Sequence, residues 1–179
     1  MNQQPNKRTA MTPDVAQPDF TELTVAVFTS GFQIRGALHI YGALQTYLND
    51  EQKPTVSVFG ADVVGLDAAN QVHMTQPEAL VYKPGAEIML FESMPPQGTL
   101  TLPPHSEALV MYLDRFAVSG KFYMGQDVRI GDFIDTGKQQ YLPLTDVKMY
   151  PLFAARPGLV NTAQLALLHR TAIRLYHKP

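Results

Sequence analysis

The sequence predicts a mainly β protein, built as two tandem small five-stranded β-barrel-like modules that each carry a short helical turn and are related by a pseudo-two-fold axis. Three observations lead to this fold class. Apolar and polar residues alternate with a period of two through most of the chain. Residues 31–40 (GFQIRGALHI) and 115–124 (RFAVSGKFYM) share one pattern of aromatic, aliphatic and glycine positions. The order strand, turn, strand, helical turn, strand, strand then follows twice. One larger barrel or sandwich with chance internal similarity is the alternative.

Prolines and composition set the expected boundaries. Residues 1–20 are polar with three prolines and are expected to form an extended tail that lies against a partner. The first module is expected over 21–93 and the second over 107–179. Between them, residues 94–106 carry two Pro-Pro pairs, which favour a stiff extended linker because proline fixes φ and cannot continue a helix.

The first module begins with a predicted hairpin, whose strands at 23–28 and 32–40 flank a short turn that contains glycine. A helical turn follows, because Leu44, Tyr47 and Leu48 have i, i+3, i+4 spacing. The remaining predicted strands are 54–67, in two pieces broken at Gly60, and 78–91, in two pieces separated by a Pro-Gly turn.

The second module repeats this order. Strands are predicted at 107–113 and 115–124, and a helical turn is predicted from the spacing of Ile130, Phe133 and Ile134. Residues 141–153 match the broken strand of the first module. The stretch 163–176 is predicted as a strand followed by a short helical turn. It also fits one amphipathic helix that could dock on a partner.

Two glycines, Gly36 and Gly120, occupy the same place in the shared pattern. Glycine weakens the middle of a strand and therefore needs a structural reason there. In small barrels that reason is a sharp bend or bulge where the strand passes from one wall to the other. We therefore interpret both as structural glycines.

The stretch 30–40 (SGFQIRGALHI), in which a turn glycine precedes a strand with a central glycine, resembles the first motif of Sm-like and SH3-like small β-barrels. The resemblance implies a small barrel in each module. Residues 41–50 and 125–135 do not reproduce the nucleotide-binding pattern of the Sm family, so RNA binding is not implied. The repeated motif is also similar to bacterial proteins of unknown function that contain one such module.

Composition excludes several kinds of chemistry. The chain has no cysteine, which excludes disulfides, thiolate metal sites and cysteine nucleophiles. Its five histidines show no i, i+2 or i, i+4 spacing, and no serine lies in a G-x-S-x-G context. Asp132 and Asp135 flank a helical turn, where we interpret them as structural. We therefore expect no catalytic, cofactor-binding or metal-binding residues and no enzymatic activity.

Only 17% of residues are charged, against about a quarter in typical soluble domains, while 45% are hydrophobic. The net charge of −2 gives no general attraction for nucleic acid. We expect a non-enzymatic interaction or assembly subunit in the cytoplasm, without a membrane span, that binds a protein partner or itself. The alternative, not favoured, is a nucleic-acid or small-ligand binding module. The expected interaction surface comprises Arg35, His39, Tyr41, Arg115, Lys121 and Tyr123.

Overall fold

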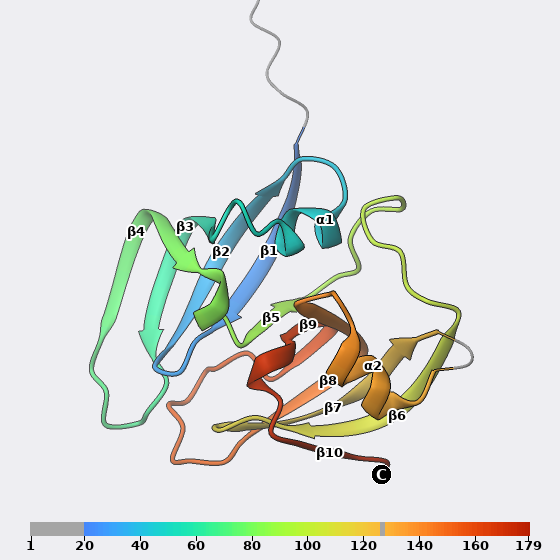
Figure 1. The fold of residues 1–179 in the computed structure, drawn as a ribbon. Helices are drawn as coiled ribbons and strands as arrows, with labels where there is room; N and C mark the ends of the chain where they lie inside the picture. The colour runs from blue at the N-terminus through green and yellow to red at the C-terminus, as the bar shows by residue number, and fades with distance from the viewer. Residues whose placement is uncertain (1–19, 126–127) are drawn as a thin grey trace, which may run out of the picture.

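The computed structural model describes residues 20–125 and 128–179, so the expected tail lies outside the described residues except for Phe20. The prediction of a mainly β fold is confirmed, since ten strands form one antiparallel sheet with two short α-helices beside it (Figure 1). The elements of the first half are β1 (Thr21–Phe28), β2 (Phe32–Ile40), α1 (Leu44–Asn49), β3 (Thr55–Gly65), β4 (His73–Tyr82), the 3-10 turn η1 (Lys83–Gly85) and β5 (Ile88–Phe91).

The elements of the second half are β6 (His105–Tyr112), β7 (Phe116–Met124), α2 (Ile130–Thr136), β8 (Tyr141–Pro151), β9 (Thr162–His169), the 3-10 turn η2 (Arg170–Ala172) and β10 (Leu175–His177). Both predicted helical turns are present as α1 and α2. The C-terminal stretch forms β9, η2 and β10, so the single docking helix considered for it does not form. Residues 165–169 of β9 are all buried, and β9 pairs with β5 on one side and β8 on the other. A short continuous buried run with a strand on each side is typical of a central strand, which explains why the strand is favoured.

The strand order is β10-β6-β7-β8-β9-β5-β1-β2-β3-β4. The two halves join where β5 pairs with β9. Among the described residues the sheet does not close on itself, so β10 and β4 are its edges and separate barrels are not confirmed. The expected pseudo-two-fold axis differs from this arrangement. A two-fold axis at the junction would pair equivalent strands, for example the fifth strand of one half with the fifth strand of the other. Instead, the fifth strand of the first half pairs with the fourth strand of the second half.

Bulges interrupt β2 and β7 at corresponding glycines. The register of β2 against β3 shifts between Arg35 and Ala37, and that of β7 against β8 shifts between Ser119 and Lys121. A Cβ atom on the intervening Gly120 would lie 2.8 Å from the carbonyl oxygen of the residue at position 145. The neighbouring strand therefore approaches too closely for any side chain at this position.

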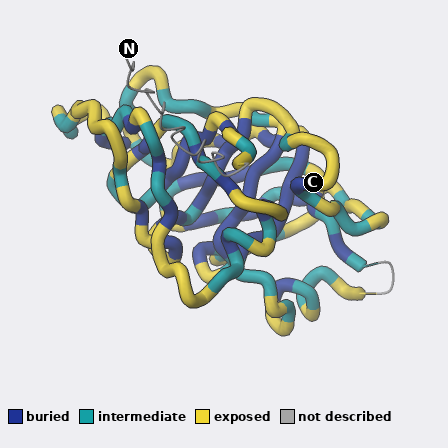
Figure 2. Tube along the Cα trace, turned by 90° about the horizontal axis from the view of Figure 1, so that it is seen from above, coloured by how far each residue is buried: buried dark blue, intermediate teal, exposed yellow. Residues whose placement is uncertain are grey.

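Two hydrophobic clusters lie on opposite faces of the sheet, and each contains side chains from both halves. The cluster centred on the second half includes residues of β1 and β5, among them Phe28 and Ile88. The cluster centred on the first half includes Tyr141, Leu165 and Leu167 from the second half. Figure 2 shows the buried residues running along the strands in the middle of the molecule. Each half therefore completes the core of the other.

A buried cation fixes α1 beside this junction. Lys83 is 2% exposed, and its ammonium donates hydrogen bonds to the carbonyl oxygens of Tyr47 at 2.9 Å and Asp50 at 3.0 Å. These oxygens lie at the C-terminal end of the helix, where a positive charge is favourable. Burial lowers the pKa of Lys83. The carbonyl of Lys83 in turn accepts a hydrogen bond from the Tyr141 hydroxyl at 2.8 Å, which ties η1 to the second half.

Candidate functional site

Among the described residues, the large apolar side chain with the greatest exposed fraction, Leu80, lies on the edge strand β4. In the segment Glu78–Tyr82 the side chains of Ala79 and Val81 turn toward the core, while Leu80 and Tyr82 turn outward because neighbouring strand residues face opposite sides. Leu80 is 68% exposed. No strand pairs with the outer side of β4 among the described residues. An edge of this kind offers unpaired backbone groups together with apolar side chains.

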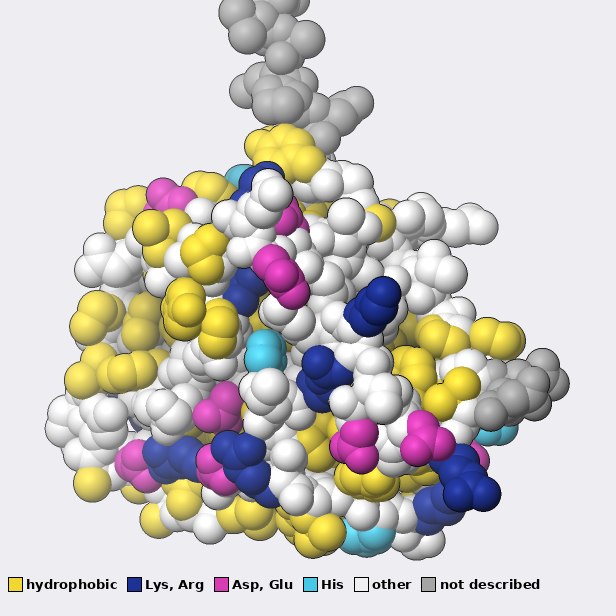
Figure 3. Space-filling view, viewed as in Figure 1, with side chains coloured by type: hydrophobic (Ala, Val, Ile, Leu, Met, Phe, Trp, Pro, Cys, Tyr) yellow, Lys and Arg dark blue, Asp and Glu magenta, His cyan; other side chains and the backbone are white. Residues whose placement is uncertain are grey.

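An apolar groove opens beside this edge. It has a volume of about 350 Å³ and lies between β4, β3 and the turn that joins β1 to β2. Its apolar walls include Phe32, Ile34, Val63, Ala79 and Val81. Figure 3 shows hydrophobic side chains gathered along the flank of the molecule that Figure 1 labels β4. Such a groove can accept apolar side chains from a strand that adds to the edge.

The opposite edge, formed by β10 on β6, also exposes apolar side chains. Leu175 is 58% exposed and lies opposite Tyr112 on β6. The Tyr112 and His177 rings have centroids 5.7 Å apart, and the Tyr112 Oη atom lies 3.3 Å from His177 Nε2. At the end of this edge Lys178 contacts Glu107 at 2.7 Å, and the hydrogen bond that Lys178 donates lowers the pKa of Glu107.

The expected interaction surface does not form one patch. Arg35, His39 and Tyr41 lie on or just after β2, and Lys121 and Tyr123 lie on β7. The β2 and β7 strands are separated in the sheet by four others. These five residues therefore belong to two separate regions.

In the first region, His39 is enclosed by neighbours. Its ring stacks between Phe20 at 4.2 Å and Phe59 at 4.3 Å, and its Nε2 atom lies 3.1 Å from the Glu22 carboxylate. Tyr41 is exposed and lies with its ring edge toward Phe20. His39 thus stabilises the outer face of β2 by contacts inside the chain.

Charged residues of the predicted surface are paired within the chain. Arg35 lies 3.3 Å from Glu92, and Lys121 lies 2.8 Å from Asp146. The hydrogen bond that Lys121 donates to Asp146 raises the pKa of Lys121. The neighbouring Tyr123 hydroxyl lies 3.1 Å from the hydroxyl of the threonine at position 145.

Arg115 is placed differently from the other five, because it joins the two halves. Its guanidinium donates a hydrogen bond to the carbonyl oxygen of Ser30 at 2.8 Å and forms an ion pair with Asp67. It also lies 3.9 Å above the ring of Phe153, a favourable cation–π distance. These contacts make Arg115 a structural residue of the junction.

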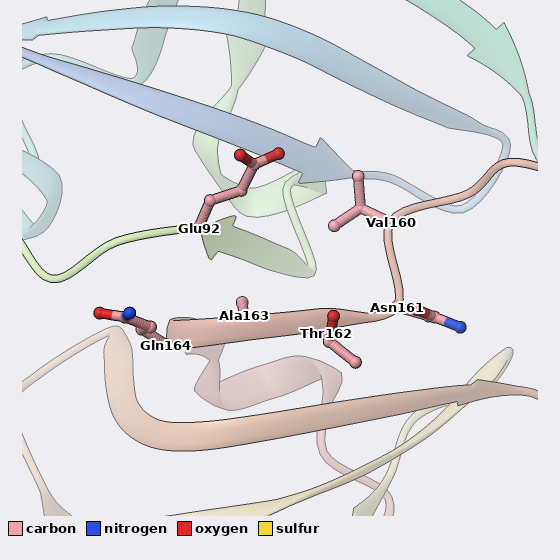
Figure 4. A pocket seen from close by; sticks show the side chains of 6 residues that line it. All are labelled: Glu92, Val160, Asn161, Thr162, Ala163 and Gln164. Carbon is pink, nitrogen blue, oxygen red and sulfur yellow. The ribbon is translucent and has the colours of Figure 1, made fainter.

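A polar hollow of about 440 Å³ lies where β5 ends and β9 begins. Figure 4 shows the side chains that line it, namely Glu92, Val160, Asn161, Thr162, Ala163 and Gln164. Glu92 supplies the one ionisable side chain of this lining and is paired with Arg35. Acid–base catalysis by a pair of carboxylates would need a second carboxylate beside Glu92, and the lining of this hollow contains none.

Across residues 20–125 and 128–179, no cluster of three histidine or carboxylate side chains is arranged to hold a metal ion. In the same described part of the chain, no helix is long and apolar enough to cross a membrane. Comparison with protein-family models, curated proteins and solved structures found no match for this chain.

Sequence reasoning missed Leu80, Tyr82 and Leu175, the exposed apolar residues at the sheet edges. The alternation in EALVY shows that Leu80 and Tyr82 share a face. Whether that face is covered depends on which strand ends the sheet. The order of the strands in the sheet decides whether that face is covered, and the alternation within one strand does not specify this order.

Proposed function

We propose that this chain is a non-enzymatic assembly subunit, built from two copies of a small five-stranded Sm-like or SH3-like module, that binds protein at the free edges of its sheet. The observation that carries the proposal is the β4 edge, where exposed Leu80 and Tyr82 lie beside an apolar groove. A strand added to this edge would gain main-chain hydrogen bonds and bury apolar surface together. The cytoplasm remains the proposed compartment.

Strand order and register support two copies of one module. The fifth strand pairs with the first, and the second, third and fourth follow, as β5-β1-β2-β3-β4 and again as β10-β6-β7-β8-β9. Each half has its bulge next to the central glycine of its second strand. The third strand of each half also has a positive φ at the same place, 56° at Gly60 and 54° at Asp146. Shared irregularities of this kind support duplication more strongly than shared strands.

The pairing of charges favours a protein over a nucleic acid as the partner. Five basic side chains of the described chain form ion pairs with carboxylates: Arg35, Arg115, Lys121, Arg174 and Lys178. Phosphate binding would require these cations to leave their partners, and the net charge of −2 adds no attraction. The exposed edges instead offer apolar surface and backbone groups, which suit another polypeptide.

The test places a photoreactive amino acid, p-benzoylphenylalanine, at position 80 on the β4 edge or at position 150, where Tyr150 is 53% exposed on β8. Both variants are irradiated as purified protein and in extract of the native source. We expect protein adducts, with itself or another chain, from position 80 and few from position 150. Equal labelling at both positions, or no protein adduct from position 80, would refute the proposal.

A further inference from the structure

A fourth strand and a fifth strand pair where the two halves join, and another fourth strand and fifth strand are left unpaired at the two ends of the sheet. At the junction, the fifth strand of the first half (β5) pairs with the fourth strand of the second half (β9). The two free edges are the fourth strand of the first half (β4) and the fifth strand of the second half (β10). We infer that the chain associates head to tail with copies of itself, β10 of one copy adding to β4 of the next. This inference rests on the proposed function and names its partner.

Burial at matching positions supports a second copy as the missing neighbour. Leu167 on β9 lies opposite Pro143, and Leu80 on β4 lies opposite Ser57 at the same place in the register. Leu167 is 1% exposed beside β5, whereas Leu80 is 68% exposed. The two positions carry the same residue and differ in the strand beside them.

The other edge shows the same contrast. Ile88 on β5 lies opposite Phe28, and Leu175 on β10 lies opposite Tyr112. Ile88 is fully buried at the junction, whereas Leu175 is 58% exposed. An added β4 strand would cover Leu175 as β9 covers Ile88. On both free edges, apolar side chains are exposed that an added β-strand would cover.

The groove beside β4 also has a filled counterpart at the junction. There, Phe28 is buried with its ring centroid 5.4 Å from that of Phe116, in an edge-to-face contact. Phe116 begins β7 as Phe32 begins β2, and Phe32 is an exposed wall of the open groove. Tyr112, which holds the place of Phe28 in the second half, would therefore enter the groove of the next copy and contact Phe32.

The register follows from the junction, where Ile88, Met89, Leu90 and Phe91 lie opposite Leu168, Leu167, Ala166 and Leu165. Transferred to the edges, it gives four pairs between copies: Leu175 with Val81, Tyr176 with Leu80, His177 with Ala79, and Lys178 with Glu78. The last pair brings Glu78 beside Lys178, which also contacts Glu107 of its own chain, and opposite charges are favourable across a strand pair. Pro77, which has no backbone N–H to donate, lies just before the four pairing residues of β4 and does not interrupt them.

Because the two surfaces differ, the contact is heterologous, and it generates closed rings or open filaments instead of a symmetric dimer. In such an assembly every inner copy has its β4 edge covered by one neighbour and its β10 edge covered by another. A symmetric contact through β4 alone would leave Leu175 exposed.

The chain has no cysteine, which makes the register directly testable. Two single variants, His177→Cys and Ala79→Cys, are mixed and oxidised with oxidised glutathione. The transferred pairing brings these positions within disulfide distance, so we expect a covalent heterodimer. The matched control mixes His177→Cys with Leu80→Cys, whose side chains would lie on opposite faces, and should yield little product. Equal yields in both mixtures would overturn the register.

Light scattering measures the association itself. We expect a mass above the 19.9 kDa of one chain that rises with concentration. Leu80→Asp should weaken the association by about tenfold or more, since it places a charge in the contact. Tyr150→Asp changes another exposed apolar side chain, one on β8 away from both edges, and should leave the mass unchanged. Circular dichroism is used to check that each variant is folded.

The outcomes separate this inference from the proposed function. A chain that stays at 19.9 kDa at every concentration, with position 80 labelling a different protein, overturns self-association and leaves the edge as a protein-binding site. A monomeric chain without any protein adduct overturns both. A larger mass that Leu80→Asp does not reduce shows association through another surface and also overturns the head-to-tail contact.

Discussion

Replacing Gly36 by alanine tests the close approach of β2 and β3. A Cβ atom at this position would lie 2.7 Å from Cγ1 of Val58 and closer still to the carbonyl oxygen of Phe59. Ordinary contacts of a Cβ atom begin near 3.4 Å. The backbone oxygen cannot rotate away, so β2 and β3 must separate at the bulge. Alanine should therefore destabilise the fold although it adds one carbon atom.

The magnitude follows from the cost of inserting atoms into a packed core, about 1–3 kcal/mol. Because one contact is with backbone, we expect the upper part of this range, about 2–3 kcal/mol. For a chain of this size that corresponds to a fall in melting temperature of about 5–10 °C. Gly120→Ala, whose nearest contact is a carbonyl oxygen at 2.8 Å, should cost less, about 1–2 kcal/mol.

The assay is urea unfolding followed by circular dichroism at one fixed protein concentration, since association shifts apparent stability. Gly31→Ala is the matched control, because an added Cβ there has no heavy atom within 4 Å. Its free energy of unfolding should change by no more than about 0.5–1 kcal/mol. If Gly36→Ala and Gly31→Ala had equal stability, the bulge would not require glycine and the argument from close approach would be wrong.

Three further substitutions test the junction. Burial raises the pKa of Tyr141 above its ordinary 10.0, so the wild type should lose stability as pH rises past about 10, and Tyr141→Phe should lose less of it in urea titrations. Burial lowers the pKa of His169 below 6.5, so stability should fall as pH drops below that value, and His169→Gln should flatten this dependence in thermal melts. Arg115→Met should cost about 1.5–3 kcal/mol in urea unfolding, whereas Arg35→Met, at an exposed ion pair, should cost less than about 1 kcal/mol; equal losses would contradict the structural role of Arg115.

Local patterns in the sequence predict most elements of this fold. The alternation of Phe32, Ile34, Leu38 and Ile40 predicts β2, and the spacing of Leu44, Tyr47 and Leu48 predicts α1. These elements are predictable because each is specified by residues within one strand or one helical turn. The 3-10 turn at Lys83–Gly85 likewise follows the Pro-Gly signal.

The arrangement of the halves was not predictable in the same way. Pairing of β5 with β9 depends on long-range contacts such as Ile88 with Leu168, and many strands of similar composition could occupy those places. The structural role of Arg115 depends on this pairing, because its partners Ser30 and Asp67 belong to the other half. A polar residue between two apolar strands gives no local sign of a contact so distant in sequence.

The shared cores have a consequence for synthesis of the chain. The core of the first half is completed by Leu165 and Leu167, which are synthesised only after all five strands of that half. Until then the first half exposes both its unfinished core and its β4 edge, the conditions under which nascent chains aggregate. Folding of the first half is therefore tied to the synthesis of β9, whose side chains complete its core.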